Sequence, residues 1–174
     1  MPKGNLIPLP AKRRLSDADR RWLMKAVGAA ALVSLPACQS VFDIGNAPVV
    51  IEAESGEEAL TKIRTSHGLP LLSADPALER TAAEQARYMA EAGRMEHTTG
   101  RGRDFATRVR AHGVEGAAAE NIAQGRYDPG GLFTAWMNSS GHRRNMLDPR
   151  FSRFGLASAE GRDGVRYWAL VLAR

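Results

Sequence analysis

Four polar side chains stand in otherwise apolar surroundings, and their types are those of a site that could carry out chemistry: His97, Glu120, Asn121 and His142. Glu120 and Asn121 interrupt the apolar run 117–123, whose other members predict a buried strand. A carboxylate there needs a cation or several hydrogen-bond donors beside it. Two imidazoles and one carboxylate are also a sufficient ligand set for a zinc-type ion that keeps one coordination position open.

The spacing alone does not make these residues a metal site. His97, Glu120 and His142 are separated by 23 and 22 residues, and the chain has no His-Glu-x-x-His motif. From the bare residues we therefore favour a structural hydrogen-bond cluster over a metal site. In such a cluster Glu120 accepts hydrogen bonds from both imidazoles and fixes the core.

A serine nucleophile is a second alternative, because Ser139 and Ser140 precede Gly141-His142. The chain has no Gly-x-Ser-x-Gly motif, and a serine three residues before a histidine on a helix is usually a cap. We do not assign a serine hydrolase. Cys38 lies ahead of the domain, which argues against a catalytic thiol.

Capping and stop signals outline the elements that must position these side chains. A helix is predicted over 52–67, where Gly68 and Pro70 follow. Asp75 followed by proline predicts the start of a second helix, which ends at Gly93. Two further helices are predicted to begin at Asp104 and Asp128.

The helix that begins at Asp104 is expected to end at Gly113 and to bury Phe105, Ala106 and Val109. After it the pattern changes. The runs 153–158 and 165–172 predict an antiparallel hairpin, and the second run is apolar on both faces, which favours helices on both sides of a sheet. Helices first and a hairpin last indicate an α+β layered domain.

The formal net charge of +5 belongs to the start of the chain. Residues 1–37 carry seven basic and two acidic side chains, and the remaining 137 residues carry 17 of each sign. The neutral remainder excludes a nucleic-acid-binding domain on charge grounds. The single cysteine excludes a disulfide framework and a four-cysteine zinc site.

The start of the chain has the anatomy of an export signal over residues 1–37. Its apolar run, 26–37, has 12 residues and is shorter than the roughly 18 that a membrane-spanning helix needs. Arg20-Arg21-Trp-Leu-Met-Lys25 resembles a twin-arginine signal. Leu35-Pro-Ala-Cys38 resembles a bacterial lipobox, so we expect lipidation at Cys38 and attachment to a membrane.

The remaining chain divides into two parts. Residues 38–51 have no periodicity and are predicted to be a tether, and residues 52–174 are predicted to be one domain. Three blocks of that domain resemble the signatures of the bacterial CAP (SCP-like) domain, which also occurs in cysteine-rich secretory, antigen 5 and plant pathogenesis-related 1 proteins. They are Met95-Glu-His97, Ala119-Glu-Asn-Ile-Ala-Gln-Gly125 and Trp136-Met-Asn-Ser-Ser-Gly-His-Arg-Arg-Asn-Met-Leu147. The resemblance covers about residues 55–172.

This resemblance implies a three-layer α-β-α sandwich with a central cleft. The family's cleft carries two histidines and two glutamates, which correspond to His97, His142, Glu120 and, for the second glutamate, Ser139. The resemblance thus implies a ligand cleft formed by His97, Glu120, Asn121, Ser139 and His142. The resemblance also implies that His97, His142 and Glu120 bind zinc or another divalent cation, but this implication is weaker because one of the family's two carboxylates is missing. We assign no cofactor.

Members of the family are reported as sterol or fatty-acid binders, antimicrobial or signalling proteins, and proteases. We expect a monomeric, lipid-anchored binding module in the cell envelope of a bacterium, on the periplasmic or outer face of a membrane, or secreted. Its ligand would be a small hydrophobic molecule (lipid or sterol-like), a peptide or a divalent ion. The alternative is a metal-dependent hydrolase or protease in which Glu120 is the general base. We favour the non-enzymatic role.

Overall fold

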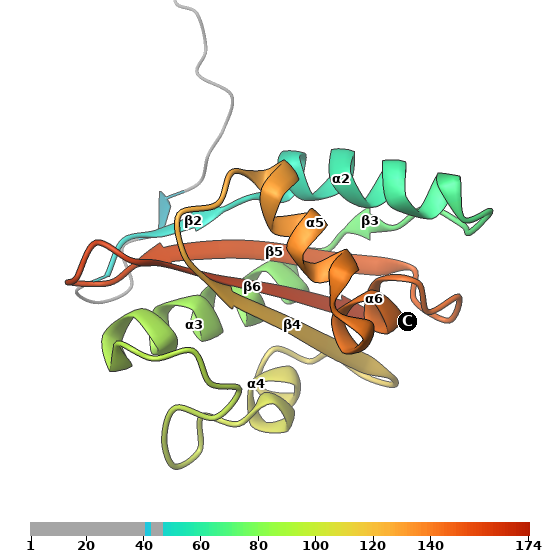
Figure 1. The fold of residues 1–174 in the computed structure, drawn as a ribbon. Coiled ribbons are helices and arrows are strands. Elements are labelled where there is room, and N and C mark those ends of the chain that lie inside the picture. The colour runs from blue at the N-terminus through green and yellow to red at the C-terminus, as the bar shows by residue number, and fades with distance from the viewer. Residues whose placement is uncertain (1–40, 43–46) are drawn as a thin grey trace, which may run out of the picture. The chain divides into compact units, whose positions relative to one another are not determined.

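A six-stranded sheet forms the middle layer of the part of the chain that the computed structural model describes, residues 41–42 and 47–174 (Figure 1). The predicted signal sequence and the predicted lipidation site at Cys38 lie outside the described residues. The strands are β1 (Val41–Phe42), β2 (Val49–Ile51), β3 (Ser73–Ala74), β4 (Ala118–Gln124), β5 (Arg153–Glu160) and β6 (Arg166–Ala173). Their order is β1-β2-β5-β6-β4, with antiparallel neighbours, and β3 pairs in parallel with β5.

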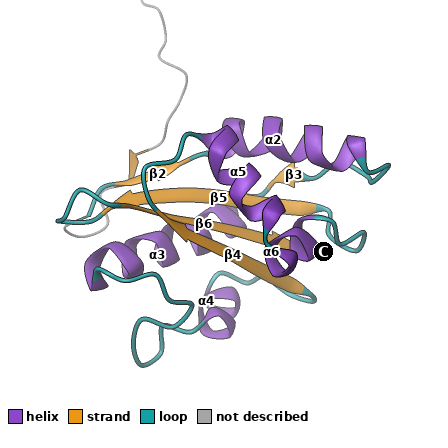
Figure 2. Cartoon of the chain, viewed as in Figure 1, coloured by secondary structure: helices purple, strands orange, loops and turns teal. Residues whose placement is uncertain are grey.

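Helices cover both faces of this sheet (Figure 2). Helices α3 (Pro76–Ala92) and α4 (Phe105–Ala111) lie on one face, and α2 (Ala53–Ser66), α5 (Pro129–Asn138) and α6 (Ser140–Met146) lie on the other. This arrangement confirms the predicted α+β fold and its three-layer α-β-α form.

The predicted caps bound α3 as the sequence indicates. The Asp75 carboxylate accepts hydrogen bonds from the backbone N–H groups of Ala77 and Leu78 at 2.8 and 3.1 Å. At the other end Gly93 adopts the left-handed conformation, φ 65°, that a residue without a Cβ tolerates. Asp104 and Asp128 cap α4 and α5 in the same way, so all three predicted starts are confirmed.

Alternation along β6 divides the core into two halves. Tyr167, Ala169 and Val171 contact the layer of α3, whereas the residues between them contact the layer of α2, α5 and α6. Both sets are buried, so the prediction of helices on both sides of this strand is confirmed. Helix α3 crosses β5 very closely at Gly155, where a Cβ would lie 2.2 Å from the α3 backbone.

The predicted tether extends too far. Residues 49–51, assigned to the segment 38–51, form strand β2, which pairs with residues 157–159 of β5. Ala47 and Val49 are buried in the core. A three-residue strand is too short to show a periodicity, and its partner lies more than 100 residues along the chain, so the local pattern gave no sign of it. The domain therefore begins before the predicted residue 52.

None of the helices in the described part of the chain is long and apolar enough to cross a membrane.

Candidate functional site

Strand β4 at the edge of the sheet brings the predicted polar residues together. Successive side chains of a strand point to opposite faces, so Glu120 and Asn121 serve different layers. Glu120 meets Arg108 of α4, with 2.6 Å between carboxylate oxygen and guanidinium nitrogen. Asn121 instead donates to the backbone carbonyl of His142 in α6 at 3.1 Å. The two histidine-bearing segments thus reach β4 from opposite faces.

On the α4 face, His97, Glu120 and Arg108 form a closed group. The Nδ1 atom of His97 lies 2.8 Å from Glu120 Oε1, while Arg108 donates to Glu120 Oε2. Arg108 also donates to the backbone carbonyls of His97 and Arg103, at 3.2 and 2.5 Å. Arg108 and Glu120 are 1% and 2% exposed, whereas the His97 side chain is 55% exposed. A buried ion pair therefore supports an exposed imidazole.

A buried side chain of α3 also holds the loop that carries His97. Gln85 of α3 is fully buried, and its side-chain amide donates to the backbone carbonyl of Glu96 at 2.7 Å. The loop has no regular secondary structure between Gly93 and Asp104, so side chains from α3 and α4 supply the hydrogen bonds that a helix or sheet would supply.

On the α6 face, amide side chains hold His142 through its backbone. Asn145 donates to the side-chain oxygen of Asn121 at 2.9 Å, and Asn121, fully buried, donates to the His142 carbonyl. The His142 ring lies against Trp136, with ring centroids 6.4 Å apart. The ring itself has no hydrogen-bond partner among the described residues.

A second buried arginine, Arg64, holds the C-terminus of α6. Arg64 of α2 donates to the backbone carbonyls of Met146 and Asp148 at 3.0 and 3.1 Å, and to those of Pro70 and Phe151. Met146 is the last residue of α6, so the guanidinium satisfies carbonyls at a helix C-terminus, where positive charge is favourable.

The two imidazoles are close enough to influence each other electrostatically. Burial, and to a smaller extent the charge of His97, lower the pKa of His142 below its ordinary value. A neutral imidazole can accept a hydrogen bond or bind a metal ion through its unprotonated nitrogen. The imidazoles of His97 and His142 are therefore two neighbouring groups beside β4 that can bind a ligand.

The donor set can be tested against the divalent ion that the resemblance implies. Glu120 already bonds through both oxygens, to His97 and to Arg108, so the structural cluster forms with Arg108 in place of the second imidazole. Across residues 41–42 and 47–174, no group of three His, Cys, Asp or Glu side chains could hold a metal ion. In this arrangement His97, Glu120 and His142 do not form a three-residue metal site. The two imidazoles are the groups that remain available to bind a ligand.

The other predicted cleft residues occupy different depths. Ser139 is half-buried at the junction of α5 and α6, three residues before His142, and its side chain caps neither helix. Asn121 lies beneath the site and not on its open surface. Among the five, His97 is exposed, Ser139 and His142 are half-buried, and Glu120 and Asn121 are buried.

Two residues that hold the site had no role in the sequence interpretation: Arg108 and Asn145. The prediction that Ala106 points inward is wrong, because Ala106 is exposed and Arg108 is buried next to Val109. Arg108 lies three residues after Phe105, on the inward stripe of the helix, and this spacing was the available signal. Arginine is mostly exposed in folded proteins, so the sequence pattern alone does not predict a buried arginine at this position.

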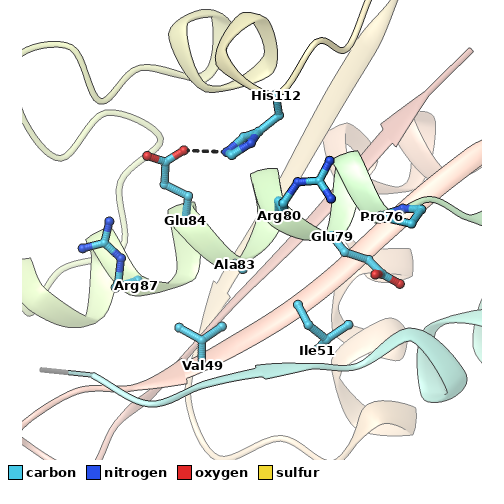
Figure 3. Close-up of a pocket in the computed structure, with 9 residues that line it drawn as sticks. All are labelled: Val49, Ile51, Pro76, Glu79, Arg80, Ala83, Glu84, Arg87 and His112. Carbon is cyan, nitrogen blue, oxygen red and sulfur yellow. Dashed lines mark hydrogen bonds and ion pairs between the residues drawn. The ribbon is translucent and has the colours of Figure 1, made fainter. Parts of the chain in front are cut away.

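A cavity of about 350 Å³ lies elsewhere, over α3 and between β2 and the end of α4 (Figure 3). Its apolar lining includes Val49, Ile51 and Ala83. Its charged lining residues have both signs, and Glu84 bonds to His112 there at 3.0 Å. None of its lining residues belongs to the group around β4.

The chain is similar in sequence to a known protein and similar in fold to solved structures. The chain is 32% identical over 98 residues to the uncharacterized protein YkwD of Bacillus subtilis (strain 168), and this match covers 56% of the chain and 38% of that protein. The chain thus spans less than two-fifths of that relative's length.

Solved structures give the same result. An extracellular protein containing a SCP domain from Bacillus anthracis str. Ames is 27% identical, with a TM-score of 0.58 over 66% of this chain and 37% of that chain. An outer surface protein from Borrelia burgdorferi is 19% identical, with a TM-score of 0.60 over 70% of this chain and 92% of that one, and shares the fold.

The model of the cysteine-rich secretory protein family, CAP, matches residues 57–172. This range contains the three sequence blocks, helices α3 to α6 and the polar group around β4. The chain belongs to the CAP family of cysteine-rich secretory proteins.

Proposed function

We propose that this protein is an exported, membrane-anchored binding module whose ligand meets the imidazoles of His97 and His142. The observation that carries the proposal is the state of Glu120, whose two oxygens are bonded to His97 and Arg108 while it is 2% exposed. A carboxylate that is buried, paired with a guanidinium and bonded to an imidazole is suited to holding that imidazole in place.

The hydrolase alternative requires a different arrangement. Glu120 is 2% exposed, so water would have to enter beside its buried pair with Arg108 before Glu120 could act as a general base. Breaking the Arg108 pair would leave a buried charge uncompensated, which is costly. No observation at this site favours that alternative, so binding is the function we put forward.

The anchor rests on the sequence at the start of the chain. An apolar run preceded by basic residues and followed by the only cysteine, Cys38, is typical of a lipidated export signal. Acylation with more than one chain gives durable attachment to a membrane. A structural relative described as extracellular supports export.

Ring resonances of the two histidines test the binding proposal directly. Three probes are added separately to the full chain labelled with ¹⁵N: zinc chloride, a tetrapeptide library and a C12 alcohol. We expect at least one probe to shift the signals of both His97 and His142, because a ligand between the rings meets both edges. A His142→Ala variant should bind that probe about tenfold more weakly.

His67→Ala is the matched control, because His67 is exposed at the end of α2 and belongs to no part of the site. It should leave the affinity unchanged. The binding proposal fails if none of the probes moves either ring. Zinc binding with a stoichiometric ion that survives His142→Ala would place the metal elsewhere.

Labelled palmitate tests the anchor. We expect incorporation into the full chain in a bacterial host and its loss in Cys38→Ala. Incorporation that persists in Cys38→Ala would contradict lipidation at this residue.

A further inference from the structure

Arg108 contacts His97 directly at its backbone and, through Glu120, indirectly at its ring. It donates to the His97 backbone carbonyl at 3.2 Å, and it donates to Glu120, which in turn bonds to the His97 ring at 2.8 Å. It also holds the carbonyl of Arg103, near the end of the His97 loop. One guanidinium therefore sets both the path of the loop and the partner of the imidazole.

The chemistry of these groups determines where the ring proton lies. A guanidinium only donates, and a carboxylate paired with it only accepts. Since Glu120 Oε1 accepts, the His97 Nδ1 atom 2.8 Å away must carry the hydrogen. In the neutral ring the opposite nitrogen, Nε2, then has a free electron pair, and it points away from the buried carboxylate.

From this geometry we infer that Arg108 is a positioning residue that fixes His97 as a hydrogen-bond acceptor at Nε2, so that the site selects a ligand group that donates, such as a hydroxyl or an amide N–H. Arg108 is 1% exposed and touches no ligand itself. The statement about which ligand group is selected rests on the proposed binding function. The Nδ1–H tautomer of His97 does not, because it is expected in the protein without any ligand.

Long-range ¹⁵N–¹H correlation spectra of the full chain measure the tautomer directly. At about pH 9 an ordinary imidazole is neutral, so the spectra report which nitrogen carries the proton. We expect His97 to be predominantly in the Nδ1–H form in the wild type. In Arg108→Lys the ratio of Nδ1–H to Nε2–H should fall at least threefold, because one ammonium cannot reproduce the fork that holds the carboxylate and two carbonyls.

Arg64→Lys is the matched control. Among the residues that the structure describes, Arg64 is the other fully buried arginine, and its hydrogen bonds go to backbone carbonyls and not to His97. The inference requires an unchanged His97 ratio in this variant. If Arg108→Lys does not fold, Arg108→Gln takes its place.

Three outcomes would overturn the inference: an Nε2–H form dominant in the wild type, a ratio in the Arg108 variant equal to that of the wild type, or an equal fall in Arg64→Lys. None of these depends on a ligand. If the tautomer ratios are as expected but no probe binds, the proposed function is contradicted and the inference about Arg108 is not.

Discussion

The two histidine-bearing segments are held in opposite ways on the two faces of β4. On the α4 face the ring of His97 is bonded to a buried carboxylate while its loop lacks regular structure. On the α6 face the backbone of His142 is fixed within a helix while its ring makes no hydrogen bond to the described residues. One imidazole is thus oriented by charge and the other by packing.

The difference shows how side-chain hydrogen bonds can fix the backbone of an irregular loop, where a helix is fixed by its own backbone hydrogen bonds. A helix satisfies most of its own backbone and needs partners chiefly at its ends, and Arg64 supplies one at the C-terminus of α6. Asn121 adds a hydrogen bond to the His142 carbonyl in the first turn. The His97 loop needs partners along its length, and Arg108 and Gln85 provide them. We expect the first face to be sensitive to charge and the second to shape.

The largest effect is expected on the charged face. Arg108→Met should lower the free energy of unfolding by about 3–5 kcal/mol, because it leaves the Glu120 carboxylate buried without its cation. Urea unfolding measures the change. Glu120→Gln combined with Arg108→Met should recover at least about 1 kcal/mol, since the unpaired charge is then gone.

The control for this cycle is Arg64→Met combined with Glu120→Gln. Arg64 bonds only to backbone carbonyls, so the two effects should add within about 0.5 kcal/mol. If the coupling energy of Arg64 with Glu120 equals that of Arg108 with Glu120, the idea that only Arg108 neutralises the Glu120 charge is contradicted.

A smaller effect is expected on the α6 face. Asn145→Ala leaves the side-chain oxygen of the buried Asn121 without its donor and should cost about 1–3 kcal/mol. Hydrogen exchange of α6 should accelerate while the His97 tautomer ratio stays constant. The exposed Asn138 makes no side-chain hydrogen bond to the described residues, so Asn138→Ala should change stability by less than about 0.5 kcal/mol. A change in the His97 ratio in Asn145→Ala would show that the two faces are coupled.

The smallest effect links the two faces through the pKa of His142. Since burial and then the charge of His97 lower this pKa, His97→Asn should raise it by removing the second cause, and burial should still hold it below the ordinary value. The unfolded chain binds this proton more readily than the folded chain does. The neutral ring's contribution to stability is therefore complete above about pH 6.5 and is lost as the pH falls toward the lowered pKa of the folded state.

Histidine titration by NMR and urea unfolding between about pH 7 and pH 5 check this prediction. His97→Asn should reduce the acid-dependent loss that His142 causes, and His67→Asn should leave the pKa of His142 unchanged. A pKa of His142 that falls in His97→Asn would reverse the sign that we derive.

Much of the fold was predictable because its signals are local. Asp75 and Gly93 bound α3 through bonds to residues within a few positions, and such signals need no knowledge of the rest of the chain. The alternation in β6 likewise predicted that both faces are covered. Strand β2 was missed because its three residues gain their structure from strand pairing, and the longer partner, β5, lies more than 100 residues along the chain.

The sequence by itself determined the caps of three helices, the covering of both faces of β6, the family, and four polar residues of the site: His97, Glu120, Asn121 and His142. Only the tertiary structure decided which partner each residue has. Glu120 pairs with Arg108 and one imidazole, not with both imidazoles, because its neighbour Asn121 points to the other face of β4, toward His142. Strand alternation is a local property, but the helix that covers each face is set by packing across the whole domain.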